Sequence, residues 1–447
     1  MSFVPHSDAD RAEMLRAIGV SSIDELYQDI PENLQLGRPL DLPKALSELE
    51  AVRLLQEYAD QNRSFLSFAG AGVYDHHVPA ALDHLIRRSE FYTAYTPYQP
   101  EVSQGTLQAI YEFQTMVCEL TGMDVANASM YDGASAAAEA ALMAMAITRR
   151  NKLILAGTLH PHYRQVIETY VAGKEAAVHD LGADPGGLLS PESLAAVADE
   201  DTAAIVVQSP NFFGLIEDLQ PLAEAAQASG AMLIVAVADA VSLALLKSPG
   251  ECGADVVAAE GQPFGAGANF GGPLVGLFAA KQKYVRKMPG RIVGGTVDAE
   301  DRRGYVLTLQ TREQQIRRGK ATSNICTNQG LIALAATIYL ALMGREGLRQ
   351  VAETSVQNAH YARSELASRG IELLYPDTPF FREFAIQTTS DARRVIRRGV
   401  DRGLLPGVCL DRFPGLSLED GLLLAFTEKH TKADIDTLVG FLAAEAT

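Results

Sequence analysis

The chain has no tryptophan, and its 447 residues include only four cysteines. The cysteines are far apart in the sequence, and none forms a CxxC pair or a Cys/His spacing that suits zinc. Neither a disulfide framework nor a metal site is therefore expected, and this cysteine usage suits a reducing cytosol. The first residues carry acids and no apolar signal-peptide core, and the longest apolar stretch, 331–343, is too short to span a bilayer. We expect a soluble, cytoplasmic protein that does not contact a membrane.

Positive charge is also scarce, since 38 Lys and Arg face 55 Asp and Glu, a net charge of −17. This balance argues against nonspecific binding to nucleic acid or to an anionic membrane. One segment differs, because residues 281–320 hold eleven Lys or Arg against four acids, a net charge of +7. Such an island suits a carboxylate, a phosphate or an acidic protein. An ordinary solvated basic helix is the alternative.

The length indicates roughly two or three domains, and the pattern divides the chain into three parts. Residues 1–60 predict an N-terminal arm with helices, the first capped by Ser7 or Asp8. Within this arm, the irregular stretch 28–43 suits either a segment that wraps another surface or a plain surface extension. Residues 61–330 alternate short apolar strands with helices, which predicts a mainly parallel sheet covered on both faces. Residues 331–447 predict a smaller α/β domain, with strands at 383–387 and 422–426 and helices at 331–342, 357–368, 392–399 and 433–444.

The most informative absence is a lysine. The apolar strand AMLIVAVAD ends at Asp239, where a parallel-sheet enzyme that holds pyridoxal phosphate (PLP) places the Asp that pairs with the ring nitrogen. Without PLP, a backbone N–H or an Arg would have to satisfy this costly carboxylate. A Schiff-base lysine is expected one strand later, but the loop there offers Gln262, and Lys247 is the only lysine between residues 175 and 280. Glutamine cannot form an imine, so the chain looks built to hold PLP without anchoring it covalently.

Two further residues complete what we call the degenerate pocket, which consists of Ser135, His160, Asp239 and Gln262. Ser135 lies in YDGAS before a predicted helix, where backbone N–H groups favour a phosphate; an ordinary helix cap is the alternative. His160 follows the strand 152–156 and is placed either to lie flat over a planar cofactor or simply to open a helix with Pro161 in its first turn. The aromatic segment 92–105, YTAYTPYQPEVSQG, suits either the wall of a cleft or a satellite core.

Four long segments together resemble one family. They are YTAYTPYQPEVSQGTLQ (92–108), ANASMYDGASAAAEAA (126–141), AEGQPFGAGANFGGPLVG (259–276) and LTLQTREQQIRRGKATSNICTNQGL (307–331). The segments FFREF (380–384) and TEKHTKADID (427–436) extend the resemblance into the last domain. All are similar to the alpha subunit, or subunit 1, of the split P-protein of the glycine cleavage system, the family of glycine dehydrogenase (decarboxylating).

The resemblance implies a PLP-dependent transferase type I fold and a homologous beta subunit. That partner would carry the Schiff-base lysine in a His-Lys-Thr motif, which falls at residues 261–263 here, and PLP would be bound there and not covalently by this chain. Two alpha and two beta chains would decarboxylate glycine and pass the aminomethyl group to the lipoyl arm of H-protein.

Residue chemistry and the segment resemblance together give the candidates for this chain's share. Tyr95, Tyr98 and Gln104 are candidates for lining the shared site, and Arg317, Arg318 and Lys320 are candidates for docking a partner. A noncatalytic scaffold or regulator with this fold is one competing function. A stand-alone PLP enzyme of the aminotransferase or cysteine desulfurase type is another.

Overall fold

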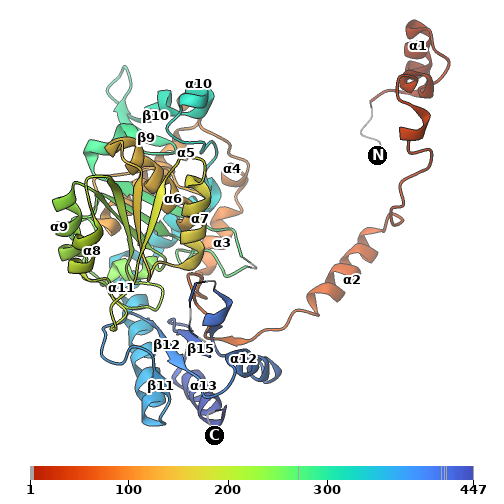
Figure 1. Cartoon of the computed structure of the whole chain (residues 1–447). Coiled ribbons are helices and arrows are strands. Elements are labelled where there is room, and N and C mark those ends of the chain that lie inside the picture. The colour runs from red at the N-terminus through yellow and green to blue at the C-terminus, as the bar shows by residue number, and fades with distance from the viewer. Residues whose placement is uncertain (1–4, 270, 414, 417, 419, 446–447) are drawn as a thin grey trace. The chain divides into compact units, whose positions relative to one another are not determined.

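The computed structural model describes residues 5–269, 271–413, 415–416, 418 and 420–445 (Figure 1). By its internal contacts the chain divides into two compact units, Met1–Arg63 and Ser64–Thr447. The further division into 61–330 and 331–447 stays a prediction.

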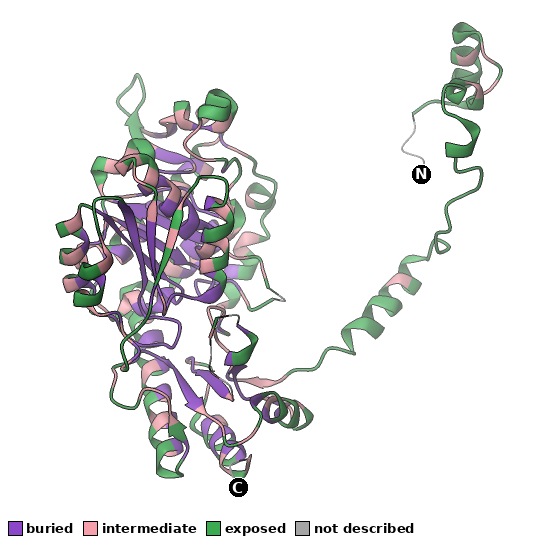
Figure 2. Cartoon of the chain, in the orientation of Figure 1, coloured by how far each residue is buried: buried purple, intermediate pink, exposed green. Residues whose placement is uncertain are grey.

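The first unit consists of short helices with exposed side chains (Figure 2). Helix α1 (Asp8–Ile18) begins at a capping box in which Ser7 accepts from Asp10 N, so the predicted cap at Ser7 is confirmed. Two 3-10 turns follow, η1 (Asp24–Tyr27) and η2 (Glu32–Leu34). Helix α2 (Glu48–Ala59) has a second capping box, and none of its residues is buried.

The second unit is built on a seven-stranded sheet with the order β2-β8-β7-β6-β5-β3-β4. Its strands are β2 (Val125–Ala126), β3 (Lys152–Ala156), β4 (Ala177–Leu181), β5 (Thr202–Gln208), β6 (Met232–Val237), β7 (Val256–Glu260) and β8 (Gly276–Ala280). The pairs from β4 through β7 are parallel, which confirms the mainly parallel sheet, whereas β8 and β2 run antiparallel at one edge.

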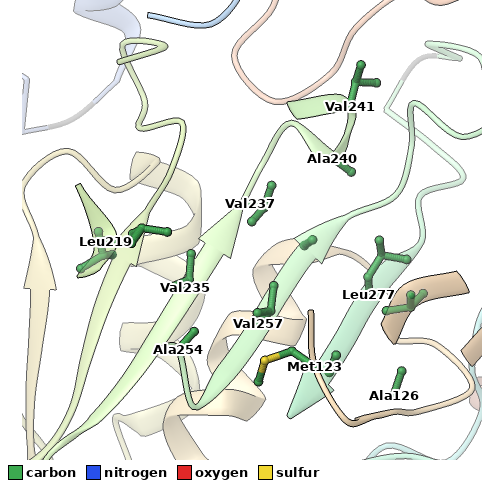
Figure 3. Close-up of a cluster of buried hydrophobic side chains, with 14 of the residues drawn as sticks. Met123, Ala126, Leu219, Val235, Val237, Ala240, Val241, Ala254, Val257 and Leu277 are labelled. Carbon is green, nitrogen blue, oxygen red and sulfur yellow. The ribbon is translucent and has the colours of Figure 1, made fainter. Parts of the chain in front are cut away.

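Apolar side chains cover both faces of this sheet. Along β3, Ile154 belongs to one core cluster, while Leu153 and Leu155 belong to the other, because successive strand residues point to opposite faces. Figure 3 shows part of the first cluster, which includes Val235 and Val257 from the neighbouring strands β6 and β7, with Met123 next to Val257. Each such fully buried aliphatic side chain stabilises the fold by about 1.5–3 kcal/mol.

Helices cover the sheet on each side (Figure 1). Helix α6 (Gly133–Thr148) contacts β5 to β8, and α7 (Pro161–Val171) packs against α6. The other helical segments between β1 (Leu66–Ser67) and β7 are α3 (Ala80–Ile86), α4 (Ser89–Tyr92), η3 (Pro100–Val102), α5 (Gln104–Thr121), α8 (Pro191–Val197), α9 (Leu219–Ser229) and η4 (Ala240–Ala244).

The basic island forms a hairpin with flanking turns. Turn η5 (Gln282–Lys287) precedes the antiparallel strands β9 (Ile292–Val297) and β10 (Arg303–Thr308). After the hairpin come η6 (Gln310–Arg312), α10 (Gln314–Arg317) and η7 (Arg318–Lys320).

The last part begins with the long helical segment α11 (Gly330–Ser368), whose backbone breaks at Gly344 with φ 58° and ψ −175°. The two helices predicted there, 331–342 and 357–368, correspond to the parts on either side of this break, and the second part begins earlier than predicted. Among the described helices, α11 is the one whose length and apolar composition would allow it to cross a bilayer. Several of its side chains, such as Ala336 and Tyr339, are instead buried in the core of the unit.

A four-stranded antiparallel sheet completes the unit, with the order β11-β12-β15-β14. These strands are β11 (Glu372–Leu373), β12 (Glu383–Gln387), β14 (Val408–Cys409) and β15 (Gly421–Ala425), and the helices beside them are α12 (Ala392–Asp401) and α13 (Lys432–Glu445). Turn η8 (Leu410–Arg412) follows β14, and β1 (Leu66–Ser67) pairs in parallel with β13 (Leu404–Leu405).

Candidate functional site

Asp239 lies directly after β6, and an arginine from the C-terminal part of the chain neutralises it. Nε and Nη2 of Arg382 donate to the two carboxylate oxygens of Asp239 at 2.5 and 2.7 Å. The side chain of Arg382 is fully buried and that of Asp239 is 6% exposed. Burial opposes the charge on Arg382, but Asp239 raises the pKa of the guanidinium above its ordinary value. An Arg therefore takes the place that a pyridine nitrogen would need.

A histidine and a carboxylate extend this ion pair. Nη1 of Arg382 donates to Nε2 of His76 at 2.7 Å, and Nδ1 of His76 lies 2.6 Å from an oxygen of Glu428. Because arginine only donates, His76 accepts at Nε2 and carries its proton on Nδ1, toward Glu428. Burial, followed by the charge of Arg382, lowers the pKa of His76, which favours this neutral form.

Tyr74 and Glu383 close the network on another side. The guanidinium of Arg382 lies 4.2 Å from the ring centre of Tyr74, whose hydroxyl donates to Glu383 at 2.8 Å. Glu383 also accepts from the backbone N–H of Ala71 at 2.7 Å. Burial raises the pKa of Glu383 to about 7.

Gln262 lies at the position expected for the lysine, and its side-chain amide makes three hydrogen bonds to the backbone. Its Nε2 donates to the carbonyl oxygens of Tyr74 at 3.0 Å and Ala266 at 2.7 Å, while its Oε1 accepts from Tyr74 N at 3.0 Å. The side chain is completely buried. A neutral amide therefore satisfies the backbone hydrogen-bonding groups of two separate loop segments at this point.

The start of α6, where a phosphate was considered, holds an internal carboxylate. Glu260 accepts from Gly133 N at 2.9 Å, Gln262 N at 2.9 Å and Val275 N at 3.2 Å. Burial raises the pKa of Glu260 to about 8. Ser135 pairs with Asp132 in a capping box, so its N–H and hydroxyl both bond to the residue that caps the helix.

His160 opens helix α7 and faces the chain itself. Its Nδ1 accepts from His162 N at 3.0 Å, and its Nε2 donates to the carbonyl of Ala71 at 3.0 Å. The ring stands edge-on to Phe212 and Phe413, with interplanar angles of 80° and 86°. Burial lowers the pKa of His160 to about 4. The geometry is that of a helix cap packed among aromatic rings.

The four residues of the degenerate pocket thus belong to one hydrogen-bonded region, but they do not fit PLP. The pyridine partner is paired with Arg382, the phosphate position holds the carboxylate of Glu260, and the lysine position holds an amide. The cavity left beside Asp239 and Arg382 has a volume of only about 10 Å³. Within the described residues, no group of three or more His, Cys, Asp or Glu is arranged to hold a metal ion.

The candidates for the shared site lie elsewhere, beside the basic hairpin. Tyr95 is 81% exposed and lines a cavity of about 180 Å³. Tyr98 is 42% exposed, and its hydroxyl bonds to Gln315 and accepts from Nη2 of Arg291 at 3.3 Å. Gln104 bonds to both the N–H and the carbonyl of Tyr305 at 2.9 Å, so it fastens α5 to β10.

The three basic candidates lie together at the end of the island. Arg317 ends α10, while Arg318 and Lys320 form η7, and all three are exposed. Nε of Arg317 donates to the carbonyl of Thr311 at 3.2 Å. Their charges are therefore available at the surface of this chain.

Residue patterns missed the residues that fill the pocket. Arg382 lies 143 positions from Asp239, and only the need for a buried carboxylate to find a partner pointed to an arginine. Glu260 stands two residues before Gln262, and its acidic side chain inside an apolar strand was the available signal. His76 gave no local signal, whereas Arg291 belongs to the basic island 281–320, whose charge was noted without this residue being singled out.

Known proteins match this chain along nearly its whole length. A family model described as glycine cleavage system P-protein matches residues 1–442. A probable glycine dehydrogenase (decarboxylating) subunit 1 from Desulforamulus reducens is 51% identical, over 99% of this chain and 100% of that protein. One with the same description from Caulobacter vibrioides is 52% identical, over 98% and 97%.

Solved structures agree with this. An inhibitor-bound crystal structure of glycine decarboxylase (P-protein) of the glycine cleavage system matches with a TM-score of 0.89 and 43% identity, over 99% of this chain and 100% of that one. A Lactobacillus brevis glutamate decarboxylase matches with a TM-score of 0.70 at 14% identity, over 93% and 95%, a likeness in fold alone. The predicted PLP-dependent type I fold is confirmed, and the chain belongs to the glycine cleavage system P-protein family, matching its subunit 1 members along its whole length.

Proposed function

We propose that this chain is the alpha subunit of a two-subunit glycine decarboxylase and that the chain is inactive without its partner subunit. The full-length match to proteins described as subunit 1 carries the proposal, and the word subunit implies a partner chain. With a beta subunit, expected as two alpha and two beta chains, it decarboxylates glycine and transfers the aminomethyl group to the lipoyl arm of H-protein.

The filled pocket supports a division of labour between the chains. PLP supplies an electron sink for loss of the carboxylate, and we assign it to the beta subunit. This chain cannot form the imine at Gln262, and Arg382 and Glu260 occupy the positions that PLP needs. Its part is to shape and close the shared site, so that bound glycine is oriented and water is excluded.

Two surfaces of the chain suit this part. Tyr95 and Tyr98 present exposed aromatic rings beside the basic hairpin, and Gln104 fixes the hairpin to α5. Arg317, Arg318 and Lys320 present three exposed cations for H-protein or the beta subunit. Exposed cations of this kind contribute mainly to the rate and specificity of docking. The place of this reaction would be the cytoplasm.

Reconstitution tests the proposal. The purified chain, a purified beta subunit, PLP, lipoylated H-protein and carboxyl-labelled glycine are combined, and release of labelled carbon dioxide is measured. Activity is expected only when both chains are present. A lone chain as active as the mixture would refute the assignment, and a borohydride-reducible PLP adduct on this chain would favour a stand-alone PLP enzyme.

A noncatalytic scaffold or regulator would have the same internally filled pocket, so substitutions must separate the two functions. Tyr95→Phe and Tyr98→Phe are compared in the mixed complex for turnover and for co-elution with the beta subunit. Lower turnover with assembly intact supports a direct share in the site. Unchanged turnover for both variants would favour the scaffold.

A further inference from the structure

A second cavity lies apart from the degenerate pocket. It has a volume of about 180 Å³ and lies between α5, the segment before η3 and the start of α11; among its lining residues are Tyr95, Thr106, Ile110, Arg291, Asn328 and Leu331. None of Ser135, His160, Asp239 and Gln262 lines it. Unlike the degenerate pocket, this one has room for a small molecule.

Arg291 is the cation of this cavity, and its charge is incompletely matched. The side chain is 7% exposed, and its Nε is buried without a hydrogen-bond partner. Its Nη2 donates to the hydroxyl of Tyr98 at 3.3 Å. The nearest carboxylate is that of Glu313, 3.8 Å from Nε, which is too far for a hydrogen bond.

Glu313 is also shared with a second arginine. The charge of Glu313 acts on Arg312, whose pKa is lowered chiefly by burial. The guanidinium of Arg312 donates to the carbonyls of Gly290 and Leu309 at 3.0 and 3.1 Å, so it is held in place. Two guanidinium groups and one carboxylate leave a net positive charge in a mostly buried place, where an anion is favoured.

The lining defines the kind of anion. It contains no Asp or Glu, so it offers no counter-charge to an ammonium group. The hydroxyls of Thr96, Thr106 and Thr327 can donate to oxygen atoms, and Phe91, Ile110, Phe113 and Leu334 form apolar walls. One cation with hydroxyl neighbours and apolar walls suits a carboxylate on a short carbon chain.

We propose that this cavity is a carboxylate-binding site with Arg291 as its anchor. A free short-chain monocarboxylate is one source of this group. The other source rests on the proposed function: it is the carboxylate of glycine, whose amino group must then lie outside this lining, on the side of the beta subunit.

The isolated chain tests the site itself. Acetate binding is measured by saturation-transfer NMR, with acetamide as the neutral probe of the same shape. Arg291→Gln should weaken acetate binding about 10- to 100-fold, the loss expected for a hydrogen-bonded charge. Ala109→Leu, which enlarges a side chain that lines the cavity from α5, should abolish it. Arg397→Gln on α12, an exposed side chain that does not belong to this lining, is the matched control and should bind as the parent does.

Three results would overturn the site. They are no acetate binding by the parent chain, equal binding of acetate and acetamide by the parent chain, or equal acetate binding by the parent chain and Arg291→Gln.

The assembled enzyme then identifies the source. If the carboxylate is that of glycine, acetate competes with glycine, and Arg291→Gln raises the KM for glycine about 10- to 100-fold with the KM for H-protein unchanged. If acetate binding is lost while the glycine KM stays constant, the site stands and its ligand is a free carboxylate. If the parent mixture does not decarboxylate glycine at all, the proposed function fails, while acetate binding to the isolated chain still decides the site.

Discussion

Removal of the Arg382 guanidinium should destabilise the chain strongly. The arginine makes two hydrogen bonds to Asp239 and one to His76, and its side chain is completely buried. Arg382→Met keeps an apolar body of similar length but leaves the Asp239 carboxylate buried without a cation. Breaking one side of such a pair costs about 3–5 kcal/mol of unfolding free energy.

A double-mutant cycle can show that the loss of unfolding free energy in Arg382→Met comes from the unpaired charge of Asp239. In Asp239→Asn/Arg382→Met the carboxylate is replaced by a neutral amide that can still accept from Val241 N, as Asp239 does at 3.2 Å. Most of the lost stability should return, because replacing both partners of a buried pair is far milder than removing one. The deficit of Arg382→Met should also shrink as the pH falls, since a buried unpaired carboxyl takes up a proton more readily.

Urea denaturation followed by circular dichroism is the suitable assay, because the chain has no tryptophan to report by fluorescence. Arg397→Met, at a side chain that is 70% exposed, is the control and should stay within about 0.5 kcal/mol of the parent. A loss below about 1 kcal/mol for Arg382→Met, or a double variant as unstable as the single one, would refute the reasoning.

Three more outcomes follow from the structure. Gln262→Lys should form no borohydride-reducible PLP adduct and should lower stability by about 2–5 kcal/mol, because a cation replaces a buried amide that makes three backbone hydrogen bonds; mass spectrometry after reduction and urea titration test this, and a modified lysine would contradict it. Burial raises the pKa of Glu139 to about 7, so the folded state holds a proton that the unfolded state has released, and stability from this group is lost as the pH rises. Between pH 5 and pH 8 the unfolding free energy of Glu139→Gln should therefore fall by about 2 kcal/mol less than that of the parent. Equal slopes of unfolding free energy against pH would contradict this. Gly214 has a φ of 80°, and a Cβ there would overlap the carbonyl oxygen of Glu383; Gly214→Ala should cost about 2 kcal/mol or more, whereas Gly403→Ala, with a φ of 75° and open space, should cost about 1 kcal/mol, and equal losses would remove the clash from the explanation.

The sequence pattern identified the strands that are buried on both faces, because their apolar runs are continuous. It did not identify β4, whose residues AVHDL are mostly exposed, since an edge strand lacks that run. It also placed two helices in the region of α11, and the first, 331–342, ends where the backbone breaks at Gly344, whereas the second begins well before the predicted residue 357. Local sequence patterns therefore identify helices and strands better than they identify the residues at which these elements begin and end.

The candidate site shows a similar limit. The position of Asp239 after its strand and the lack of a lysine at Gln262 were both readable, because each depends on a few neighbouring residues. The partner of Asp239 lies 143 residues away and reaches it only through the fold. The same holds for the bond between Tyr74 and Gln262, whose residues are 188 positions apart. Contacts of this length carry no local periodicity, so sequence patterns alone leave them open.

The internal filling of the degenerate pocket has a consequence for how the chain is produced. A protein that is stabilised by a bound ligand gains or loses stability with the free concentration of that ligand. Here Arg382 and Glu260 satisfy the groups that a cofactor would otherwise satisfy. The chain can therefore fold at any supply of PLP. Under the proposed assignment of PLP to the beta subunit, cofactor shortage would limit that subunit and leave a stock of this chain ready for assembly.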